Sequence, residues 1–133
     1  MIFQPALLEE KTRALVPVLE RAGLPFALLF GSAGRRQAFH DLDVGIVAEL
    51  DLKRLLELGA DLEKAAGLPV DLVDLERAPT ALQFEASKGI PLILQDPERL
   101  AAWKERVWNS YFAEAQFLHD YAREMLQARA QNQ

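Results

Sequence analysis

The feature that most constrains the fold of this chain is an apolar run, residues 24–30, that stops abruptly at the Gly-Ser pair of residues 31–32. The next apolar run, residues 41–47, begins with the triplet Asp-Leu-Asp. Short apolar runs bounded by turn residues are typical of buried strands. We therefore expect two strands of one sheet. A glycine turn follows the first strand, and two carboxylates lie at the solvent-exposed start of the second.

The rest of the chain alternates between helical and strand patterns. Asp51 and Gly67 suit the start and the end of one helix, because these residue types cap helix termini. Its apolar spacing predicts inward-facing side chains at Leu52, Leu55, Leu56, Leu62 and Ala66. We expect further helices over 7–22, 79–88 and 97–130, and strands over 70–75 and 90–94, the last at an edge because it contains proline. This order predicts an α/β (α+β) fold, with a small mixed sheet flanked by helices and a long C-terminal helix.

Composition excludes several classes of protein and of site. The chain has 133 residues, a net charge of −5, no cysteine and two histidines. We therefore expect one domain with no disulfide or thiolate metal site, and without the basic surface that nonspecific nucleic-acid binding needs. Its apolar runs are too short to span a membrane and its first residues do not resemble a secretion signal, so we expect a cytoplasmic protein that does not bind membranes.

Three aspartates lie on predicted strands. Asp41 and Asp43 are two residues apart, so both side chains leave the same face of the strand. Asp71 lies between aliphatic residues, where a charge is costly unless it is paired or bound to a metal. If the two strands are neighbours, three carboxylates converge, and such hard oxygen ligands favour Mg²⁺, or Mn²⁺, over zinc.

The turn after residues 24–30 has the residue types of a phosphate-binding loop. Gly31 lets the backbone approach a bulky ligand, and Ser32 adds a hydroxyl group. Arg35 and Arg36 add donors suited to phosphate oxygens. We therefore expect these four residues to bind a phosphorylated cofactor or substrate.

The Gly-Ser turn, the Asp-x-Asp triplet and the later strand aspartate resemble, in this order, the nucleotidyltransferase superfamily of the DNA polymerase β type, over residues 24–94. The size resembles the minimal nucleotidyltransferases. The resemblance implies a palm-like fold and Mg²⁺-dependent transfer of a nucleoside monophosphate, AMP from ATP, to a hydroxyl group, with release of pyrophosphate. It implies that the catalytic metal ligands are Asp41, Asp43 and Asp71. It also implies that the phosphate-binding residues are Gly31, Ser32 and Arg35.

Members of this kind often occur with a small helical partner of the HEPN class, which looks like an RNase toxin. They act as its antitoxin, some by attaching AMP to a tyrosine of the partner, so the resemblance implies such a partner here. The turn departs from the common family pattern, Gly-Ser-Arg-Ala-Arg-Gly followed by Ser-Asp-x-Asp. Arg36 stands at the second glycine, and His40 stands before the first aspartate.

The predicted C-terminal helix is the second informative feature. About thirty helical residues span about 45 Å, more than a domain of this size needs to cover its sheet. We therefore divide the single domain into a nucleotidyltransferase core, residues 1–96, and a helix, residues 97–133, that extends it. Part of the helix should pack on the sheet and part should bind the partner. The expected partner residues are Trp103, Trp108, Tyr111 and Phe112.

The individual signals leave alternatives open. A Gly-Ser pair can simply end a strand, and aspartates can mark the entry to a strand or an exposed edge. A non-catalytic protein that neutralises a helical partner by binding alone is a second hypothesis, motivated by Arg36 and the aromatic helix. A small-molecule nucleotidyltransferase, acting on an antibiotic hydroxyl group for example, ranks third because the chain has little room for an acceptor domain.

Overall fold

The computed structural model describes residues 1–132 and contains a four-stranded sheet with strand order β3-β2-β1-β4. The strands are β1 (Phe26–Phe30), β2 (Leu42–Ile46), β3 (Val70–Asp74) and β4 (Ile90–Leu94). β1 is antiparallel to both β2 and β4, whereas β2 and β3 are parallel. The parallel pair needs a crossover connection, which α3 (Leu52–Ala66) provides. The sheet is mixed as predicted, and the edge position of the fourth strand is confirmed.

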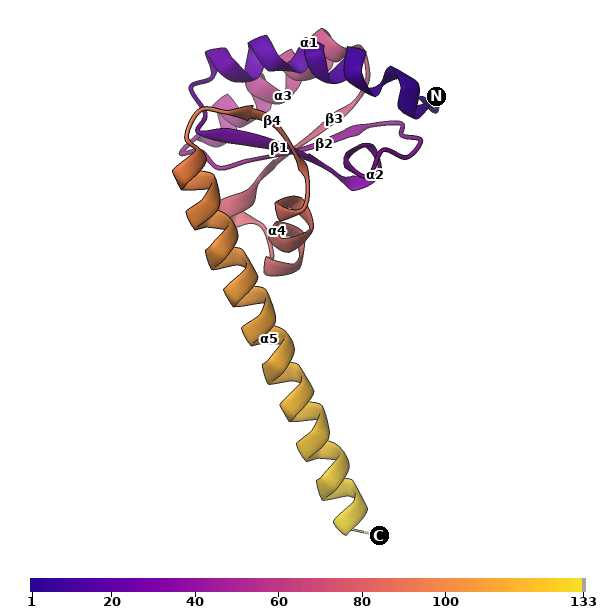
Figure 1. Ribbon diagram of the computed structural model, residues 1–133, viewed down its shortest axis with the longest axis vertical. Coiled ribbons are helices and arrows are strands. Elements are labelled where there is room, and N and C mark those ends of the chain that lie inside the picture. The colour runs from indigo at the N-terminus through magenta and orange to yellow at the C-terminus, as the bar shows by residue number, and fades with distance from the viewer. Residues whose placement is uncertain (133) are drawn as a thin grey trace.

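Helices lie on both faces of the sheet (Figure 1). α1 (Leu8–Arg21) and α3 cover one face, and α4 (Thr80–Ser87) and the first part of α5 (Pro97–Gln131) cover the other. The four-residue α2 (Gly31–Gly34) connects β1 to β2, and short 3-10 turns η1 (Pro5–Leu7) and η2 (Leu75–Arg77) precede α1 and α4. The predicted fold class is confirmed. Gln133, the last residue of the predicted C-terminal extension, lies outside the described residues.

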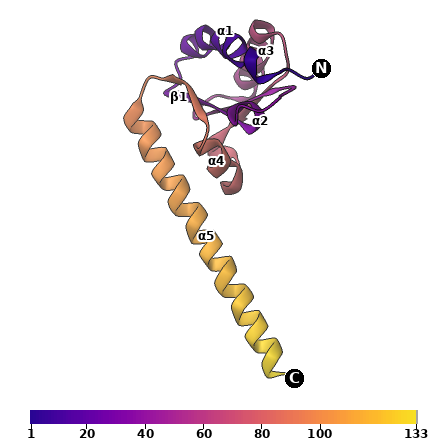
Figure 2. The same cartoon turned by 45° about the vertical axis from the view of Figure 1, so that its right-hand side comes forward.

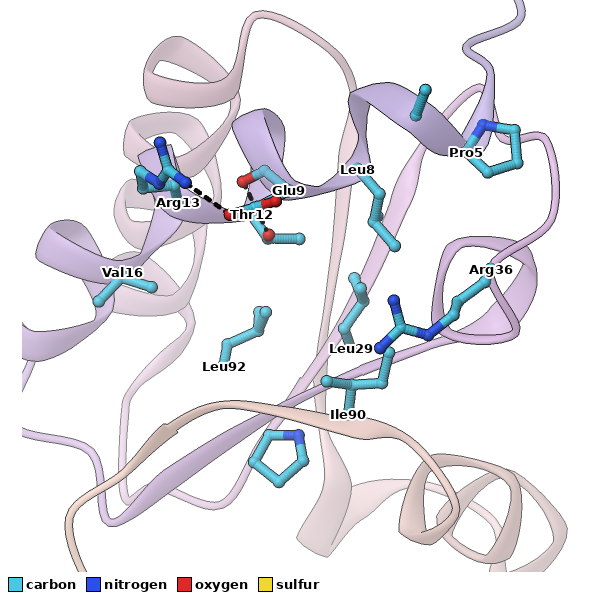
Figure 3. A pocket seen from close by; sticks show the side chains of 12 residues that line it. Pro5, Leu8, Glu9, Thr12, Arg13, Val16, Leu29, Arg36, Ile90 and Leu92 are labelled. Atoms are coloured by element: carbon cyan, nitrogen blue, oxygen red, sulfur yellow. Dashed lines mark hydrogen bonds and ion pairs between the residues drawn. The ribbon is translucent and has the colours of Figure 1, made fainter.

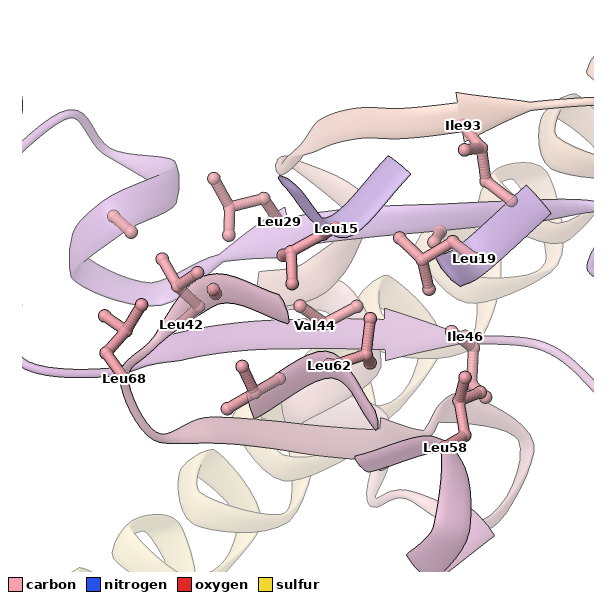
Figure 4. Packing of buried hydrophobic residues seen from close by; sticks show 14 of the residues in the cluster. Leu15, Leu19, Leu29, Leu42, Val44, Ile46, Leu58, Leu62, Leu68 and Ile93 are labelled. Atoms are coloured by element: carbon pink, nitrogen blue, oxygen red, sulfur yellow. The ribbon is translucent and has the colours of Figure 1, made fainter. Parts of the chain in front are cut away.

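The larger core lies between the sheet and the α1–α3 layer (Figure 4). Alternate residues of β2 point into it, among them Leu42 and Val44, and meet Leu15 of α1 and Leu62 of α3. Both predicted caps of α3 are confirmed, because the Asp51 side chain accepts the Arg54 N–H and Gly67 is left-handed. The predicted inward face is wrong at Leu52 and Leu56, which are 66% and 65% exposed. The side chains that face the sheet follow the spacing Leu55, Leu58, Leu62 and Ala66.

The smaller core lies on the opposite face of the sheet. Phe26 of β1 is fully buried there and packs against Trp103, with ring centroids 5.5 Å apart. Leu100 and Val107 of α5 are buried in the same cluster. Trp103, which we expected on the partner surface, is only 2% exposed. It is therefore a core residue, and that part of the prediction is wrong.

Beyond its first turns, α5 leaves the body of the protein (Figures 1 and 2). The helix has 35 residues without a break, which is about 52 Å at 1.5 Å per residue. A hydrogen bond from the Thr80 hydroxyl to Glu114 still ties it to α4. Past that point its apolar side chains are exposed: Phe117, Leu118, Tyr121, Met125 and Leu126. No helix within residues 1–132 has the length and apolar character to cross a membrane.

Candidate functional site

Two of the predicted aspartates face each other across the parallel pair of strands. Asp43 of β2 is the register partner of Asp71 of β3. Side chains alternate along a strand, so both carboxylates lie on the face opposite to buried Leu42 and Val44. Asp41 precedes β2 by one residue and is exposed. The condition that the sequence left open, that the two strands are neighbours, is met, and the three carboxylates lie at one end of the sheet.

Asp43 is the carboxylate at the centre of this group. Its partial burial, and then the charges of Asp41 and Asp71, raise its pKa from 3.8 to about 6. Arg35 acts in the opposite direction but does not cancel the effect. Carboxylates that repel one another in this way gain most from a cation placed between them.

The turn that follows β1 brings backbone close to Asp43. Phe30, the last residue of β1, is the register partner of Asp43, and Gly31 follows with φ +68°. A Cβ atom at this position would overlap with Oδ2 of Asp43 and lie 3.0 Å from its Cγ. Only glycine therefore allows the Asp43 carboxylate to pack directly against this turn. Ser32 follows in α2 and is partly exposed.

Arg35 ends α2 beside a cavity of about 210 Å³ on the same face of the sheet. Its guanidinium Nη1 lies 3.1 Å from Oε1 of Glu85, and Nζ of Lys88 lies 3.2 Å from Oε2 of the same carboxylate. Gly31 and Arg35 both line this cavity. The structure therefore brings together Gly31, Arg35 and the Asp43 carboxylate, as the sequence analysis expected.

Arg36 lies elsewhere, although the sequence analysis grouped it with Arg35. Its side chain lines a cavity of about 590 Å³ between α1 and β4, together with Leu29 and Ile90 (Figure 3). Arg36 has φ +59° and is the one non-glycine residue in the left-handed region within residues 1–132. This is the position at which the family pattern has glycine, the residue that adopts positive φ most readily, and the Arg36 side chain points into the cavity beside α1.

Glu85 and Lys88 are residues of this site that the sequence analysis did not single out. Both belong to the end of α4, which is far from the Gly-Ser turn in the chain. The sequence signal for them is weak, because it consists only of a lysine followed by Gly89 before the last strand. Their place beside Arg35 depends on how α4 packs against β1.

The donor set fits a hard divalent cation. Asp41, Asp43 and Asp71 offer carboxylate oxygens only, and neither histidine belongs to the group. Within residues 1–132, no three acidic or imidazole side chains are already gathered into a closed metal cage. A cation bound among the three carboxylates would offset their mutual repulsion and draw their oxygens together.

Comparisons with known proteins assign the chain to a nucleotidyltransferase family. Residues 14–98 match the family model described as "Polymerase beta, Nucleotidyltransferase". A comparison with curated protein sequences found no match.

Three solved structures with the same fold are described as toxin–antitoxin complexes. A toxin–antitoxin structure with AMP-PNP is 25% identical, has a TM-score of 0.69, and is matched over 84% of this chain and 98% of that one. A complex described as tri-AMPylated Shewanella oneidensis HEPN toxin with MNT antitoxin is 24% identical, with a TM-score of 0.68 over 87% of this chain and 98% of that one. A complex of MntA with HepT is also 24% identical, with a TM-score of 0.67 over 86% and 98% of the two chains.

Proposed function

Since this chain belongs to the polymerase β nucleotidyltransferase family, we propose that it transfers AMP from ATP to a hydroxyl group of a small helical partner of the HEPN class. The observation that carries the proposal is the pairing of Asp43 with Asp71, with the turn at Gly31 packed directly against Asp43. The antitoxin structure that contains AMP-PNP supports a nucleotide substrate. The complex with a tri-AMPylated HEPN toxin supports both the group transferred and the kind of acceptor.

In this proposal Asp41, Asp43 and Asp71 hold Mg²⁺, or Mn²⁺, which when bound neutralises charge on the triphosphate. The acceptor hydroxyl oxygen attacks the α-phosphorus of ATP, and the bond from that phosphorus to the pyrophosphate oxygen breaks. Pyrophosphate leaves with the electron pair. The carboxylate of Asp71, exposed at the edge strand, takes up the hydroxyl proton.

The phosphate-binding side of the site is formed by the turn. Gly31 lets the triphosphate approach the backbone, and Ser32 supplies a hydroxyl group. Arg35, whose side chain is half exposed beside the 210 Å³ cavity, neutralises phosphate charge there. Arg36 contributes the left-handed backbone of the turn rather than a direct phosphate contact.

We place the partner on the part of α5 that leaves the body of the protein. Trp108 and Phe112 are 41% and 53% exposed, and Tyr111 is half buried because it stacks on Phe84. The apolar side chains beyond Glu114 continue this surface along the helix. An exposed apolar stripe of this length on a helix is typical of a protein–protein contact.

Two further assignments belong to the proposal. We treat residues 1–96 as the nucleotidyltransferase core and residues 97–133 as the extension that binds the partner. We place the protein in the cytoplasm, because the proposed reaction consumes ATP, which is supplied there.

The proposal is tested with the purified protein, Mg²⁺ and a small helical protein encoded beside its gene. ATP labelled at the α-phosphate should label the partner, whereas ATP labelled at the γ-phosphate should not, because pyrophosphate leaves. Labelling of the partner by γ-labelled ATP would mean phosphoryl transfer and would contradict the proposal.

A second candidate function is neutralisation of the partner by binding alone. The observation that favours it is the exposed apolar stripe of α5, because this surface includes none of the three aspartates and could bind a partner without them. In that case the partner binds tightly and loses its activity, but no label from α-labelled ATP reaches it.

A further inference from the structure

The Glu85 carboxylate binds two cations, one with each of its oxygens. Oε1 lies 3.1 Å from Nη1 of Arg35, and Oε2 lies 3.2 Å from Nζ of Lys88. The side chains of all three are partly exposed, at 39% for Glu85, 51% for Arg35 and 49% for Lys88. Two cations that converge on one anion from different segments of the chain form the basic geometry of an anion-binding site.

The backbone segments that carry the two cations are held together by packing rather than by the ion pairs. Gly34, before Arg35, and Gly89, after Lys88, both pack against the carbonyl group of Leu29. A Cβ atom at residue 34 would lie 2.7 Å from that carbonyl oxygen, and a Cβ atom at residue 89 would overlap with it. The two turns therefore stay close together whether or not the Glu85 carboxylate lies between them.

Lys88 is held toward this site by a second contact. Its Nζ lies 4.9 Å from the centroid of the Phe84 ring, a favourable cation–π position. The other face of that ring is stacked on Tyr111, with centroids 3.9 Å apart. The ammonium group is thus positioned by residues of α4 and α5 and does not depend on Glu85 alone.

The cavity beside these ion pairs lies next to the transfer site. It is lined by Phe30 and Gly31, which contact Asp43, as well as by Arg35, Glu85 and Lys88. Glu85 is the acidic residue in this lining. Exposed ion pairs are weak, about 0–1 kcal/mol each, whereas a phosphate chain carries several charges and more acceptor oxygens.

We propose that Glu85 occupies the place of a phosphate group between Arg35 and Lys88, and that the pyrophosphate portion of the nucleoside triphosphate displaces it. This inference rests on the proposed function, because it names residues of that same site. Lys88 becomes a phosphate-binding residue, and Arg35 and Lys88 neutralise the charge of the departing pyrophosphate. Glu85 lowers affinity for the nucleotide and returns to the two cations when pyrophosphate leaves.

The test measures binding, by calorimetry, of AMP-PNP with Mg²⁺ and of inorganic tripolyphosphate with Mg²⁺. Glu85→Gln should tighten both about threefold to tenfold, since it removes the competing charge. Lys88→Met should weaken both about tenfold, because it removes a charge-assisted contact. In the double variant the gain from Glu85→Gln should shrink, because one of the two cations is missing. The affinity for adenosine, which has no phosphate, should not change in any variant.

Glu9→Gln is the matched control. Glu9 pairs with Arg13 at 2.6 Å on the surface of α1, so this variant makes the same change of charge away from the aspartates. It should leave both affinities unchanged, which separates a local effect of Glu85 from general attraction of anions. Glu85→Ala, which removes the carboxylate without adding an amide, should tighten binding in the same way as Glu85→Gln.

The outcomes separate this inference from the proposed function. If the wild type binds AMP-PNP with Mg²⁺ but neither Glu85 variant binds more tightly than Glu9→Gln, Glu85 does not compete and the inference is wrong. In that case the proposed function stands. If the wild type binds neither AMP-PNP nor ATP at millimolar concentration, both are overturned.

Discussion

A Cβ atom on Gly31 would overlap with the Oδ2 atom of Asp43, so the turn after β1 and the central carboxylate of the site are packed as one unit. Gly31→Ala should therefore displace the Asp43 side chain and abolish binding of AMP-PNP with Mg²⁺. The matched control is Gly23→Ala, because Gly23 also has positive φ, +70°, but has open space where the Cβ atom would stand. Both variants should lose about 1 kcal/mol of stability from backbone strain, and only Gly31→Ala should lose nucleotide binding. Equal binding by the two variants would show that the contact does not matter.

The raised pKa of Asp43 predicts a pH-dependent stability of the metal-free protein. The folded state releases this proton near pH 6 and the unfolded state near pH 3.8, so the folded state binds more protons between these values. The free energy of unfolding should therefore fall as the pH rises through this window.

Asp43→Asn should remove this loss and stabilise the metal-free protein at pH 7.5 by about 1 kcal/mol, a modest value because solvent reaches the carboxylate. The measurement is urea unfolding at pH 4.5 and 7.5, with Asp61→Asn on the exposed surface of α3 as the control. If Asp43→Asn lowers the free energy of unfolding by the same amount at both pH values, the carboxylates do not repel one another as described.

The two tryptophans of α5 should behave differently. Trp103 is buried against Phe26, so Trp103→Ala should cost about 3–5 kcal/mol of stability through the cavity it leaves. Trp108 is 41% exposed and donates its indole N–H to the Ser87 hydroxyl at 3.0 Å, so Trp108→Ala should cost only about 1–2 kcal/mol. Denaturant unfolding measures both values. Similar losses for the two variants would mean that α5 packs differently from our description.

Truncation after Glu114 should separate folding from partner binding. The shortened chain keeps the buried residues of α5 and the hydrogen bond from Thr80 to Glu114, so its thermal midpoint should change by only a few degrees. It should bind the helical partner more weakly, because the part of the exposed apolar stripe beyond Glu114 is gone, although Trp108 and Phe112 remain. Phe117→Ser in the full chain should weaken binding, whereas Gln116→Ser should not. Full affinity of the truncated chain would mean that the exposed side chains beyond Glu114 do not belong to the interface.

Much of the fold could be predicted from local patterns. The caps of α3 follow from Asp51 and Gly67, and the edge position of β4 follows from Pro91. The inward face of α3 could not be predicted as well, because leucines at 52, 55, 56 and 58 fit more than one helical stripe. Contact with the sheet selects one of these stripes.

The candidate site was predictable where its residues lie close in the chain or on strand ends. The convergence of Asp43 and Asp71 was predictable only on the condition that their strands are neighbours, which the structure meets. The direction of Arg36 was not predictable, because it depends on the left-handed backbone of that residue. Glu85 and Lys88 were missed because the packing of two glycines on the Leu29 carbonyl brings them to Arg35 across the sheet.

The most direct test of the account compares three variants in transfer from α-labelled ATP to the helical partner with Mg²⁺. Asp43→Asn and Asp71→Asn remove the two carboxylates that face each other. The control, Asp74→Asn, changes a second aspartate of β3, whose carboxylate accepts the Glu76 N–H. We expect the first two variants to lose transfer by at least about a thousandfold and the third to retain it. Transfer retained by Asp43→Asn would contradict the account.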